Sequence, residues 1–180
     1  VSVSVSAVND APVLASVSDV SFDEDLSGSL SLSADDVDGD NLTYSITGGS
    51  DIAATLDGSD VSFSAPANYN GSEVFNVSVS DGTVSDSQSF TVTVNAVNDA
   101  PVASATSSTT FEDQDAVIAL SGSDIDGDEL TYSITGGSDI SATLDGSDIS
   151  FSAPANYNGS EVFNVSVSDG TVSDSQSFTV

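Results

Sequence analysis

The chain has 180 residues, of which 29 are Asp or Glu and none is Lys, Arg, His or Cys, so its formal charge at pH 7 is −29. This composition excludes side-chain salt bridges and disulfides, and the charge argues against nucleic acid and against anionic membrane surfaces as partners. An enzyme would have only carboxylates for chemistry, and four Tyr with no Trp do not indicate a sugar-binding cleft. We therefore expect no enzymatic activity, and no apolar run is long enough for membrane insertion.

The chain contains an internal repeat. Residues 41–92 match residues 129–180 except at Asn41/Glu129, Ala53/Ser141 and Val61/Ile149. The spacing between matched residues is 97 − 8 = 89 before the acidic turn and 126 − 38 = 88 after it, so one residue is missing, most simply opposite Asp23. We predict that 1–8 is the last strand of an upstream repeat, that 9–97 is the first full repeat, and that 98–180 is a second repeat truncated at its C-terminus, all within a longer array.

Apolar and polar residues alternate almost throughout, which indicates half-buried strands and not helices. Leu42, Tyr44 and Ile46 alternate with polar residues, and so do the apolar residues of 75–79 and 90–94. Asp-Gly and Gly-Gly pairs mark turns between these runs. The predicted fold class is all-β, with tandem antiparallel β-sandwich domains of about seven strands joined end to end by Greek-key topology.

Tracing the strands up and down such a sandwich places most acidic and amide side chains at its two ends. The lower end of the first repeat should carry Glu24, Asp25, Asn70 and Glu73. The upper end of the second repeat should carry Asp124, Asp126, Asp128 and Asp169, with Asn98 and Asp99 in the linker between the two repeats. The matching upstream set is Asn9, Asp10, Asp36, Asp38, Asp40 and Asp81, and Glu112 is the counterpart of Glu24.

These clusters contain only oxygen ligands and the chain has no cation to balance them. Two carboxylates about 4 Å apart repel by roughly 4 kcal/mol at an effective dielectric constant near 20, so clustered acids require solvent, protonation or a metal. Ca²⁺ accepts about six to eight oxygen ligands in flexible geometry, whereas Mg²⁺ is less suited to such a cage. We therefore expect Ca²⁺ at the junctions between repeats; the alternative is a solvated acidic surface.

Several motifs resemble the bacterial cadherin-like tandem repeats of giant secreted adhesins, including those of the RTX type. They are Asn98-Asp99-Ala100-Pro101, the Asp124 to Asp128 loop, Leu130–Ile134, Asn156–Glu161 and Val167–Gly170. The resemblance implies a cadherin/immunoglobulin-like fold with Ca²⁺ at each junction. By resemblance the ligands are Glu24, Asn70 with Glu73, Asn98, Asp99, Asp124, Asp126 and Asp169. The motif before the sixth strand and the start of the linker differ from the cadherin pattern, so the resemblance leaves the number of ions open.

The sequence thus favours calcium-stiffened extender repeats of a long cell-surface or secreted adhesin or matrix fibre. The expected partners are neighbouring repeats, with lateral self-association as an additional contact, and the expected location is the surface of a Gram-negative bacterium, in a biofilm context. The alternative is an adhesive module that binds glycan, ice or itself through an exposed sheet face. Sugar binding that survives removal of Ca²⁺ would favour that alternative.

Overall fold

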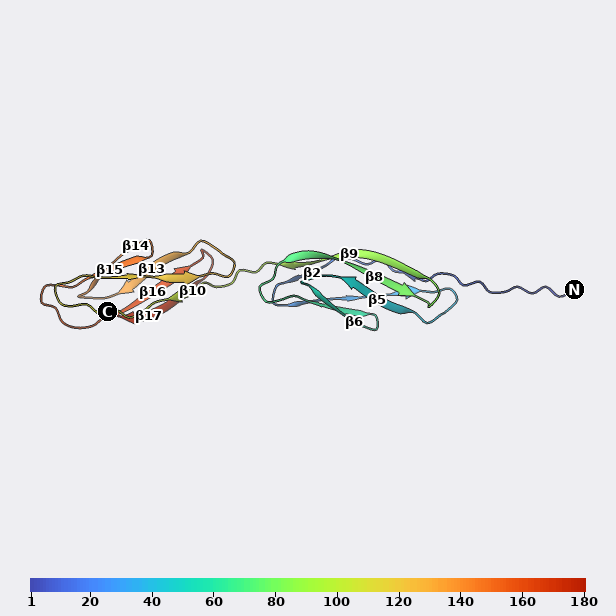
Figure 1. Cartoon of the computed structure of the whole chain (residues 1–180), viewed down its shortest axis with the longest axis horizontal. Helices are drawn as coiled ribbons and strands as arrows, with labels where there is room; N and C mark the ends of the chain where they lie inside the picture. Colours follow the sequence, from blue (N-terminus) through green and yellow to red (C-terminus); the bar gives the residue numbers. More distant parts are fainter. The chain divides into compact units, whose positions relative to one another are not determined.

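The computed structural model describes all residues 1–180 and divides into two compact units, Val1–Val97 and Asn98–Val180. We call them the first and second domains and describe each by itself (Figure 1). Both consist of strands and turns without helices, so the predicted all-β sandwich class is confirmed. Accordingly, there is no helix long and apolar enough to cross a membrane.

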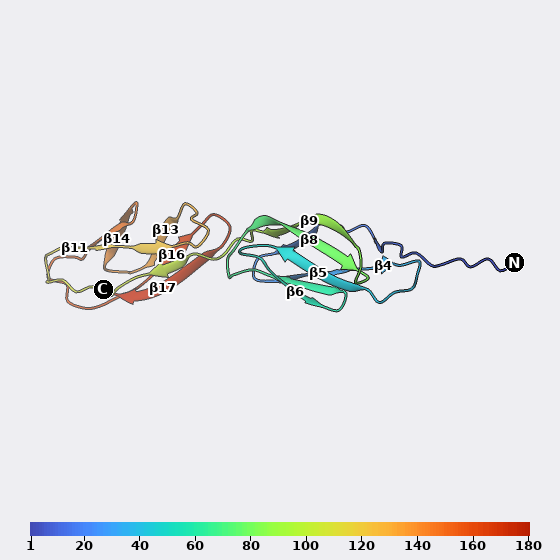
Figure 2. The same ribbon diagram turned by 45° about the vertical axis from the view of Figure 1, so that its right-hand side comes forward.

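The first domain is a sandwich of two main sheets. One sheet has the order β2-β9-β8-β5, and the other has the order β3-β7-β6. A two-stranded pair, β1-β4, completes the domain. The strands are β1 (Val13–Leu14), β2 (Val20–Asp23), β3 (Ser27–Ser31), β4 (Ala34–Asp35), β5 (Thr43–Gly48), β6 (Ala53–Asp57), β7 (Asp60–Ser64), β8 (Gly71–Ser80) and β9 (Ser85–Asn95). Figure 2 shows β5, β8 and β9 side by side.

The second domain repeats this arrangement with fewer paired residues. Its sheets are β13-β16-β17, β11-β15-β14 and β10-β12. The strands are β10 (Val102–Ser104), β11 (Ala116–Ala119), β12 (Ser121–Ser123), β13 (Thr131–Gly136), β14 (Ser141–Asp145), β15 (Asp148–Ser152), β16 (Val162–Ser168) and β17 (Ser173–Thr179). No strand here corresponds to β2, because residues 105–115 form no strand.

The first strand departs from the sequence-based expectation. The predicted sandwich is antiparallel, but the segment after Pro12 splits into β1, which is antiparallel to β4, and β2, which is parallel to β9. The chain changes sheets between Leu14 and Val20, so each half of the segment adds to a different sheet. A strand that switches sheets can close both edges of a sandwich, which a single continuous strand cannot do.

The alternating residues form the core as predicted. Phe75, Val77 and Val79 of β8 are fully buried, and the ring of Phe75 lies 5.4 Å from that of Phe63 in the opposite sheet, edge to face. In the second domain the rings of Phe151 and Phe163 make the same contact at 4.9 Å. Each core is therefore centred on aromatic contacts between its two sheets, and the acidic side chains are left to the ends and turns.

Candidate metal centre

The linker motif begins the second domain and is fixed by two acidic residues of that domain. The side-chain amide of Asn98 donates to the backbone oxygen of Asp99 and to Oδ2 of Asp169, each at 2.8 Å. The backbone N–H of Asp99 donates to Oδ2 of Asp126, also at 2.8 Å. Pro101, two residues after Asp99, is buried. The extended geometry that proline imposes on the preceding residue thus carries Asn98 and Asp99 to the end of the sandwich.

The Asp124–Asp128 loop is organised by the carboxylate of its first residue. Oδ1 of Asp124 accepts the backbone N–H groups of Asp126, Gly127 and Asp128 at 2.9, 3.1 and 3.3 Å. Gly127 has a φ of +81°, a left-handed conformation that glycine adopts without strain. This folding of the loop turns three acidic side chains toward one another, and carboxylate oxygens of Asp124, Asp126 and Asp128 all lie within 4.8 Å of each other.

The second oxygen of Asp124 distinguishes this cluster from an ordinary solvated turn. Oδ2 of Asp124 is buried and accepts no hydrogen bond. A buried carboxylate oxygen without a donor or a cation is costly, because the charge has lost its water and gained nothing in return. The group of three carboxylates therefore includes a residue with a buried anionic oxygen that accepts no hydrogen bond, which is an arrangement that a bound cation would complete.

Asp169, in the β16–β17 turn, holds the linker residue Asn98. Its Oδ1 accepts the backbone N–H groups of Thr171 and Val172 at 2.6 and 2.7 Å, and its Oδ2 accepts the Asn98 amide. The Asn98 amide, followed by the Val172 N–H, lowers the pKa of Asp169 below its usual value. Asp169 is therefore held in the anionic form at the end of the domain where the linker begins.

The first domain contains the same site, built from its own residues. Asn9 donates to Oδ2 of Asp81 at 2.9 Å, and the backbone N–H of Asp10 donates to Oδ2 of Asp38 at 2.7 Å. The Asn9 amide likewise lowers the pKa of Asp81. Oδ2 of Asp36 is buried and accepts no hydrogen bond, as in Asp124. Carboxylate oxygens of this cluster also lie within 4.8 Å of one another; its members are Asp36, Asp38 and Asp40.

The geometry of both clusters fits a calcium ion. Ca²⁺ binds oxygens at about 2.3–2.6 Å, so two ligands on opposite sides of one ion are separated by at most about 5 Å. Three carboxylate oxygens within 4.8 Å of one another can therefore share one Ca²⁺. Mg²⁺ requires about 2.0–2.1 Å and a near-ideal octahedron, which demands a tighter cage. The clusters contain neither nitrogen nor sulfur ligands, as expected for a hard cation.

Glu24 has a separate environment at the other end of the first domain. Its side chain is only 4 % exposed, and its Oε1 accepts the backbone N–H of Val97 at 2.6 Å. Its Oε2 is buried and accepts no hydrogen bond. Glu112, its counterpart in the second domain, is exposed. The first domain therefore has a second anionic oxygen without a donor, beside the residue that directly precedes Asn98 in the chain.

The structure gives Glu73 another role than the ligand role we expected. Its two carboxylate oxygens accept the Ser50 hydroxyl and the backbone N–H groups of Ser50, Asp51 and Ile52 at 2.6–3.1 Å. The Ser50 hydroxyl, then the Asp51 N–H, lower the pKa of Glu73 to about 2. Glu161 binds the matching turn, Ser138–Ile140, in the same way. Glu73 and Glu161 each stabilise a turn of their own domain by accepting its backbone N–H groups, and we leave them outside the candidate metal centre.

Asp25 and Asn70 are not brought into either cluster. Oδ1 of Asp25 accepts the backbone N–H of Asn68 at 3.1 Å, and both residues have positive φ angles of 61° and 55°. Asp113 and Asn156 repeat this contact in the second domain. Asn70 is exposed. The contact of Asp25 joins two loops of one domain, so the geometry assigns it a structural part.

Asp86, which is outside the predicted set of metal ligands, has a structural role. Oδ2 of Asp86 accepts the backbone N–H of Leu14 at 2.9 Å, and Asp174 does the same for Ala103. These bonds fasten the short strands β1 and β10, whose few backbone bonds would hold them weakly. Gln88, two residues after Asp86, bonds the same segment at the Leu14 oxygen and the Val17 N–H. The sequence alone does not show the role of Asp86, because that role depends on the chain changing sheets between β1 and β2.

Comparison with known families identifies the domains. The sequence profile of the Bacterial Ig domain family matches residues 9–95 and again residues 98–180. The chain belongs to this family. Bacterial Ig domains of this kind are typically non-enzymatic, and tandem copies suggest an extracellular extender or adhesion module. No curated protein matches the chain.

Two solved structures are reported as similar to the chain. The chain is 18 % identical to human protocadherin-24 EC1-2 in its second crystal form, with a TM-score of 0.57, over 96 % of this chain and 99 % of that one. It is 24 % identical to an endo-fucoidan hydrolase from glycoside hydrolase family 107, over 94 % of this chain, with a TM-score of 0.41. The chain spans 28 % of the length of that hydrolase. The protocadherin likeness shows a cadherin-like fold for this pair of bacterial Ig domains.

Proposed function

We propose that these bacterial Ig domains are calcium-stiffened extender repeats of a long cell-surface or secreted adhesin or matrix fibre. The observation that carries the proposal is the buried, unpaired carboxylate oxygen that occurs twice, in Asp36 and in Asp124, each within a cluster of three acids. The chain contains no side chain that could neutralise them. A divalent cation from the medium is then the partner that their chemistry favours.

One member of the second domain's cluster, Asp126, also holds the linker. Asp126 accepts the N–H of Asp99 and Asp169 accepts the amide of Asn98, so an ion bound by these carboxylates acts on the linker backbone. On the preceding side, Glu24 of the first domain holds the N–H of Val97, the residue before Asn98. Val97 is therefore bonded to Glu24, whose Oε2 accepts no hydrogen bond. Asn98 and Asp99 are bonded to Asp169 and Asp126 of the second domain. Binding Ca²⁺ would order this linker and relieve the repulsion between the acids.

The parent protein in this proposal is a giant adhesin of the RTX type on a Gram-negative bacterium, with neighbouring repeats as the partners of each domain. The repeated motifs support it, since a run of near-identical domains with ordered linkers extends a binding region away from a surface. The family assignment fits an extracellular or surface protein.

Small-angle scattering and thermal unfolding of the 180-residue chain test the proposal. Added Ca²⁺ should increase the maximum dimension and raise the melting temperature, because an ion at about 100 times its Kd stabilises the folded state by about 2.7 kcal/mol. A chelator should reverse both effects, and Mg²⁺ at equal concentration should have a smaller effect. A variant carrying Asp36→Asn and Asp124→Asn should not respond. If chelation changes neither the dimension nor the melting temperature, the acids are only a solubilising surface.

A further inference from the structure

Strand β5 is an open edge of the four-stranded sheet in the first domain. It pairs with β8 on one side, and no strand pairs with its other side. Figure 2 shows β5 as the last strand of the row β9, β8, β5. In the second domain β13 holds the same edge position, beside β16. Each domain therefore presents a strand of six residues whose outer side has no strand partner.

The hydrophobic core is incompletely covered at this edge. Val77 and Val79 of the central strand β8 are 0 % exposed. Their partners on β5, Ile46 and Tyr44, pack against the same core but are only half-buried. The matching residues of β13 are half-buried as well. A strand added beside β5 or β13 would therefore bury apolar surface that water now reaches.

The edge also lacks the features by which proteins usually prevent strand pairing between molecules. β5 and β13 contain no charged residue and no proline, whereas the edge strand β6 ends on Asp57 and the edge strand β2 contains Asp23. The outward-facing residues of β5 and of its neighbours β8 and β9 are Ser, Thr, Asn and one Val. In a chain with a formal charge of −29, a second copy that approaches this surface meets no carboxylate on it.

The sequence of β5 is nearly symmetric about its third residue, Ser45. Residues 43–47 read Thr-Tyr-Ser-Ile-Thr, and residues 131–135 of β13 are the same. In an antiparallel pair of two such strands centred on Ser45, Thr43 lies opposite Thr47 and Tyr44 lies opposite Ile46. Threonine pairs and pairs of an aromatic with a β-branched residue are favourable across antiparallel strands. The strand is therefore complementary to a second copy of itself.

We propose that β5 of one copy of this chain pairs antiparallel with β5 or β13 of a second copy, centred on Ser45 or Ser133, so that the two sheets become one continuous sheet. The pairing forms about four to six backbone hydrogen bonds. It leaves Thr43, Ser45 and Thr47 on the outer face and places the half-buried Tyr and Ile of both copies on the core side. In this register Asp40, which precedes β5, lies opposite Ser50 of the second copy, so its carboxylate does not face another one.

This contact goes beyond the proposed extender function, because it joins chains side by side and uses no carboxylate. Each chain has two such edges, one per domain, so the pairing can continue from copy to copy. A longer array of these repeats would have one edge per repeat, and contacts that are weak singly would add up along it. The pairing can be tested without Ca²⁺. Its failure would therefore leave the role proposed for the Asp36 and Asp124 clusters untouched.

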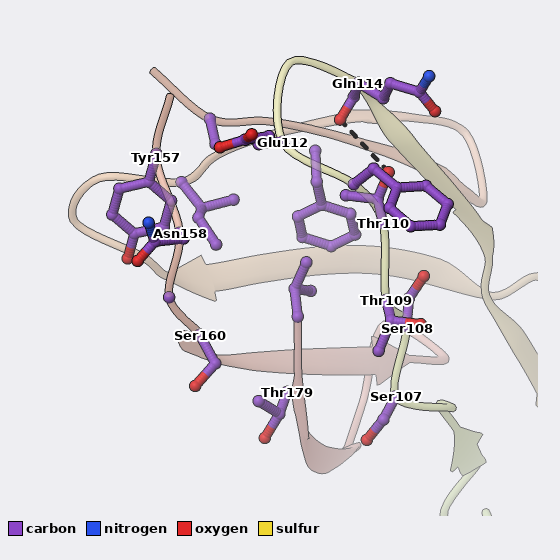
Figure 3. Close-up of a pocket in the computed structure, with 16 residues that line it drawn as sticks. Ser107, Ser108, Thr109, Thr110, Glu112, Gln114, Tyr157, Asn158, Ser160 and Thr179 are labelled. Atoms are coloured by element: carbon purple, nitrogen blue, oxygen red, sulfur yellow. Dashed lines mark hydrogen bonds between the residues drawn. The ribbon is translucent and has the colours of Figure 1, made fainter. Parts of the chain in front are cut away.

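The proposed contact is separate from the cavity of the second domain. That cavity, of about 610 Å³, lies between Ser107–Gln114 and Tyr157–Ser160. Figure 3 shows Thr110 on one side of it and Tyr157 with Asn158 on the other. No residue of β13 lines the cavity. Substitutions on the outer face of β13 should therefore leave it unchanged.

Sedimentation velocity of the 180-residue chain tests the pairing, in chelator and about 0.15 M NaCl, where the Debye length is about 8 Å. The wild type should form oligomers whose average size rises with concentration up to about 1 mM, a range that includes weak contacts. The double variant Ser45→Asp, Ser133→Asp should associate at least about 10-fold more weakly, because carboxylates would lie directly opposite one another in each pair.

The matched control is the double variant Ser87→Asp, Ser175→Asp. Ser87 lies in the same cross-strand row as Ser45, and Ser175 lies in the same row as Ser133. The control therefore adds the same charges to the same face, but two strands or about 10 Å away from the edge. It should associate like the wild type. Thermal unfolding should show similar stability for the two double variants.

Cysteine cross-linking tests the register independently of charge. The chain has no cysteine, so Ser45→Cys can form a disulfide only between copies. Directly opposite residues of an antiparallel pair have Cβ atoms about 4.5–5.5 Å apart, close to the spacing of a disulfide. Thr47→Cys is also at an exposed residue of β5, but in the proposed register the two Thr47 residues are about 13 Å apart. Ser45→Cys should therefore cross-link at least about 10-fold faster under mild oxidation.

Three results would overturn the proposal. The first is a wild-type chain that stays monomeric up to about 1 mM. The second is equal weakening of association by the two double variants. The third is cross-linking of Ser45→Cys and Thr47→Cys at the same rate, which would show contact between copies without the proposed register.

Discussion

The backbone N–H of Asp99 donates to Oδ2 of Asp126 at 2.8 Å, and that of Asp10 donates to Asp38 at 2.7 Å. In each domain an aspartate shortly before the first strand, Asp10 or Asp99, is thus bonded through its backbone N–H to a carboxylate of the three-acid cluster. This bond occupies one oxygen of Asp126 and leaves the other for its acidic neighbours. Any change in the charge of the cluster should therefore be transmitted to the linker backbone.

Asp126→Asn should weaken Ca²⁺ binding at the second domain by about 10-fold or more while leaving the site at Asp38 unchanged. The asparagine oxygen can still accept the Asp99 N–H, so the loop should keep its fold while it loses one charged ligand. Calorimetric titration of the full chain should then resolve one weakened and one normal class of site. Asp145→Asn, a change at an exposed hairpin turn, is the matched control and should bind like the wild type. Equal weakening of both classes would contradict separate sites.

Val77→Ala should lower the free energy of unfolding by about 2–3 kcal/mol, because it removes two buried methyl groups and leaves a cavity beside the phenylalanines. Val77 is completely buried, whereas Val74 on the same strand is 64 % exposed. Val74→Ala, the same chemical change, should cost less than about 1 kcal/mol, mostly through strand propensity. Denaturant unfolding measures both values. Similar losses for the two variants would show that the alternation does not define the core.

Much of this architecture follows from the sequence because its signals are local. Alternation of period two set Phe75, Val77 and Val79 inside, and the Asp-x-Asp-Gly-Asp loop folds on its own first carboxylate. The gathering of Asn98, Asp126 and Asp169 could also be predicted, since the up-and-down path of strands determines which turns share an end. These features need only strand order and turn chemistry.

Other features depend on contacts that no local pattern records. Glu73 is 23 residues from Ser50 in the chain, and its four donors are visible only once β8 is in register with β5. The split of β1 from β2 depends on which sheet edge is open at each end of the sandwich. Glu24 is buried and Glu112 exposed although their local sequences match, because only Glu24 has the backbone of Asn95 and Val97 beside it.

Glu73→Gln should destabilise the 49–52 turn at neutral pH but not at pH 2. The folded-state pKa of Glu73 is lowered to about 2 from 4.5, so the carboxylate contributes stability above about pH 4.5 and loses it as the pH falls through 2. Glutamine offers one acceptor oxygen instead of two. At pH 7 the loss should be about 1 kcal/mol, discounted for solvent screening at this partly exposed group.

Thermal unfolding from pH 7 to pH 2 gives the readout for Glu73. The melting temperatures of the variant and the wild type should differ at pH 7 and converge near pH 2, and amide exchange at Ser50–Ile52 should be faster in the variant. Asp51→Asn, which keeps the Asp51 N–H donor, is the control. A constant difference across the pH range would mean that the clamp does not depend on charge.

Gly49→Ala should be more destabilising than Gly58→Ala, although both glycines have positive φ angles, +74° and +63°. An added Cβ at Gly49 would lie 2.4 Å from the Ile52 oxygen and 2.6 Å from the Phe75 ring, whereas Gly58 has open space around it. Gly58→Ala should therefore cost only the left-handed backbone penalty of about 1–2 kcal/mol. Gly49→Ala should exceed that value by at least about 1 kcal/mol in denaturant unfolding. Equal losses of unfolding free energy for the two variants would mean that the turn at Gly49 can shift to accept the added Cβ without disturbing the core.

Glu24→Gln should change the stability of the chain in opposite directions with and without Ca²⁺. In chelator, Oε2 of Glu24 is a buried anionic oxygen that accepts no hydrogen bond, and replacing it with a neutral amide removes the desolvated charge. The glutamine side chain can still accept the Val97 N–H through its remaining oxygen. The variant should therefore equal or exceed the wild type in melting temperature without Ca²⁺. With saturating Ca²⁺ the wild type should be the more stable, because the lost charge is a lost ligand.

Glu112→Gln, the same change at an exposed residue, should shift neither value by more than about 1 °C, consistent with the small effects of surface substitutions. A Glu24→Gln variant that is less stable than the wild type by the same amount in both conditions would show that Glu24 serves the fold alone and has no part in binding the ion.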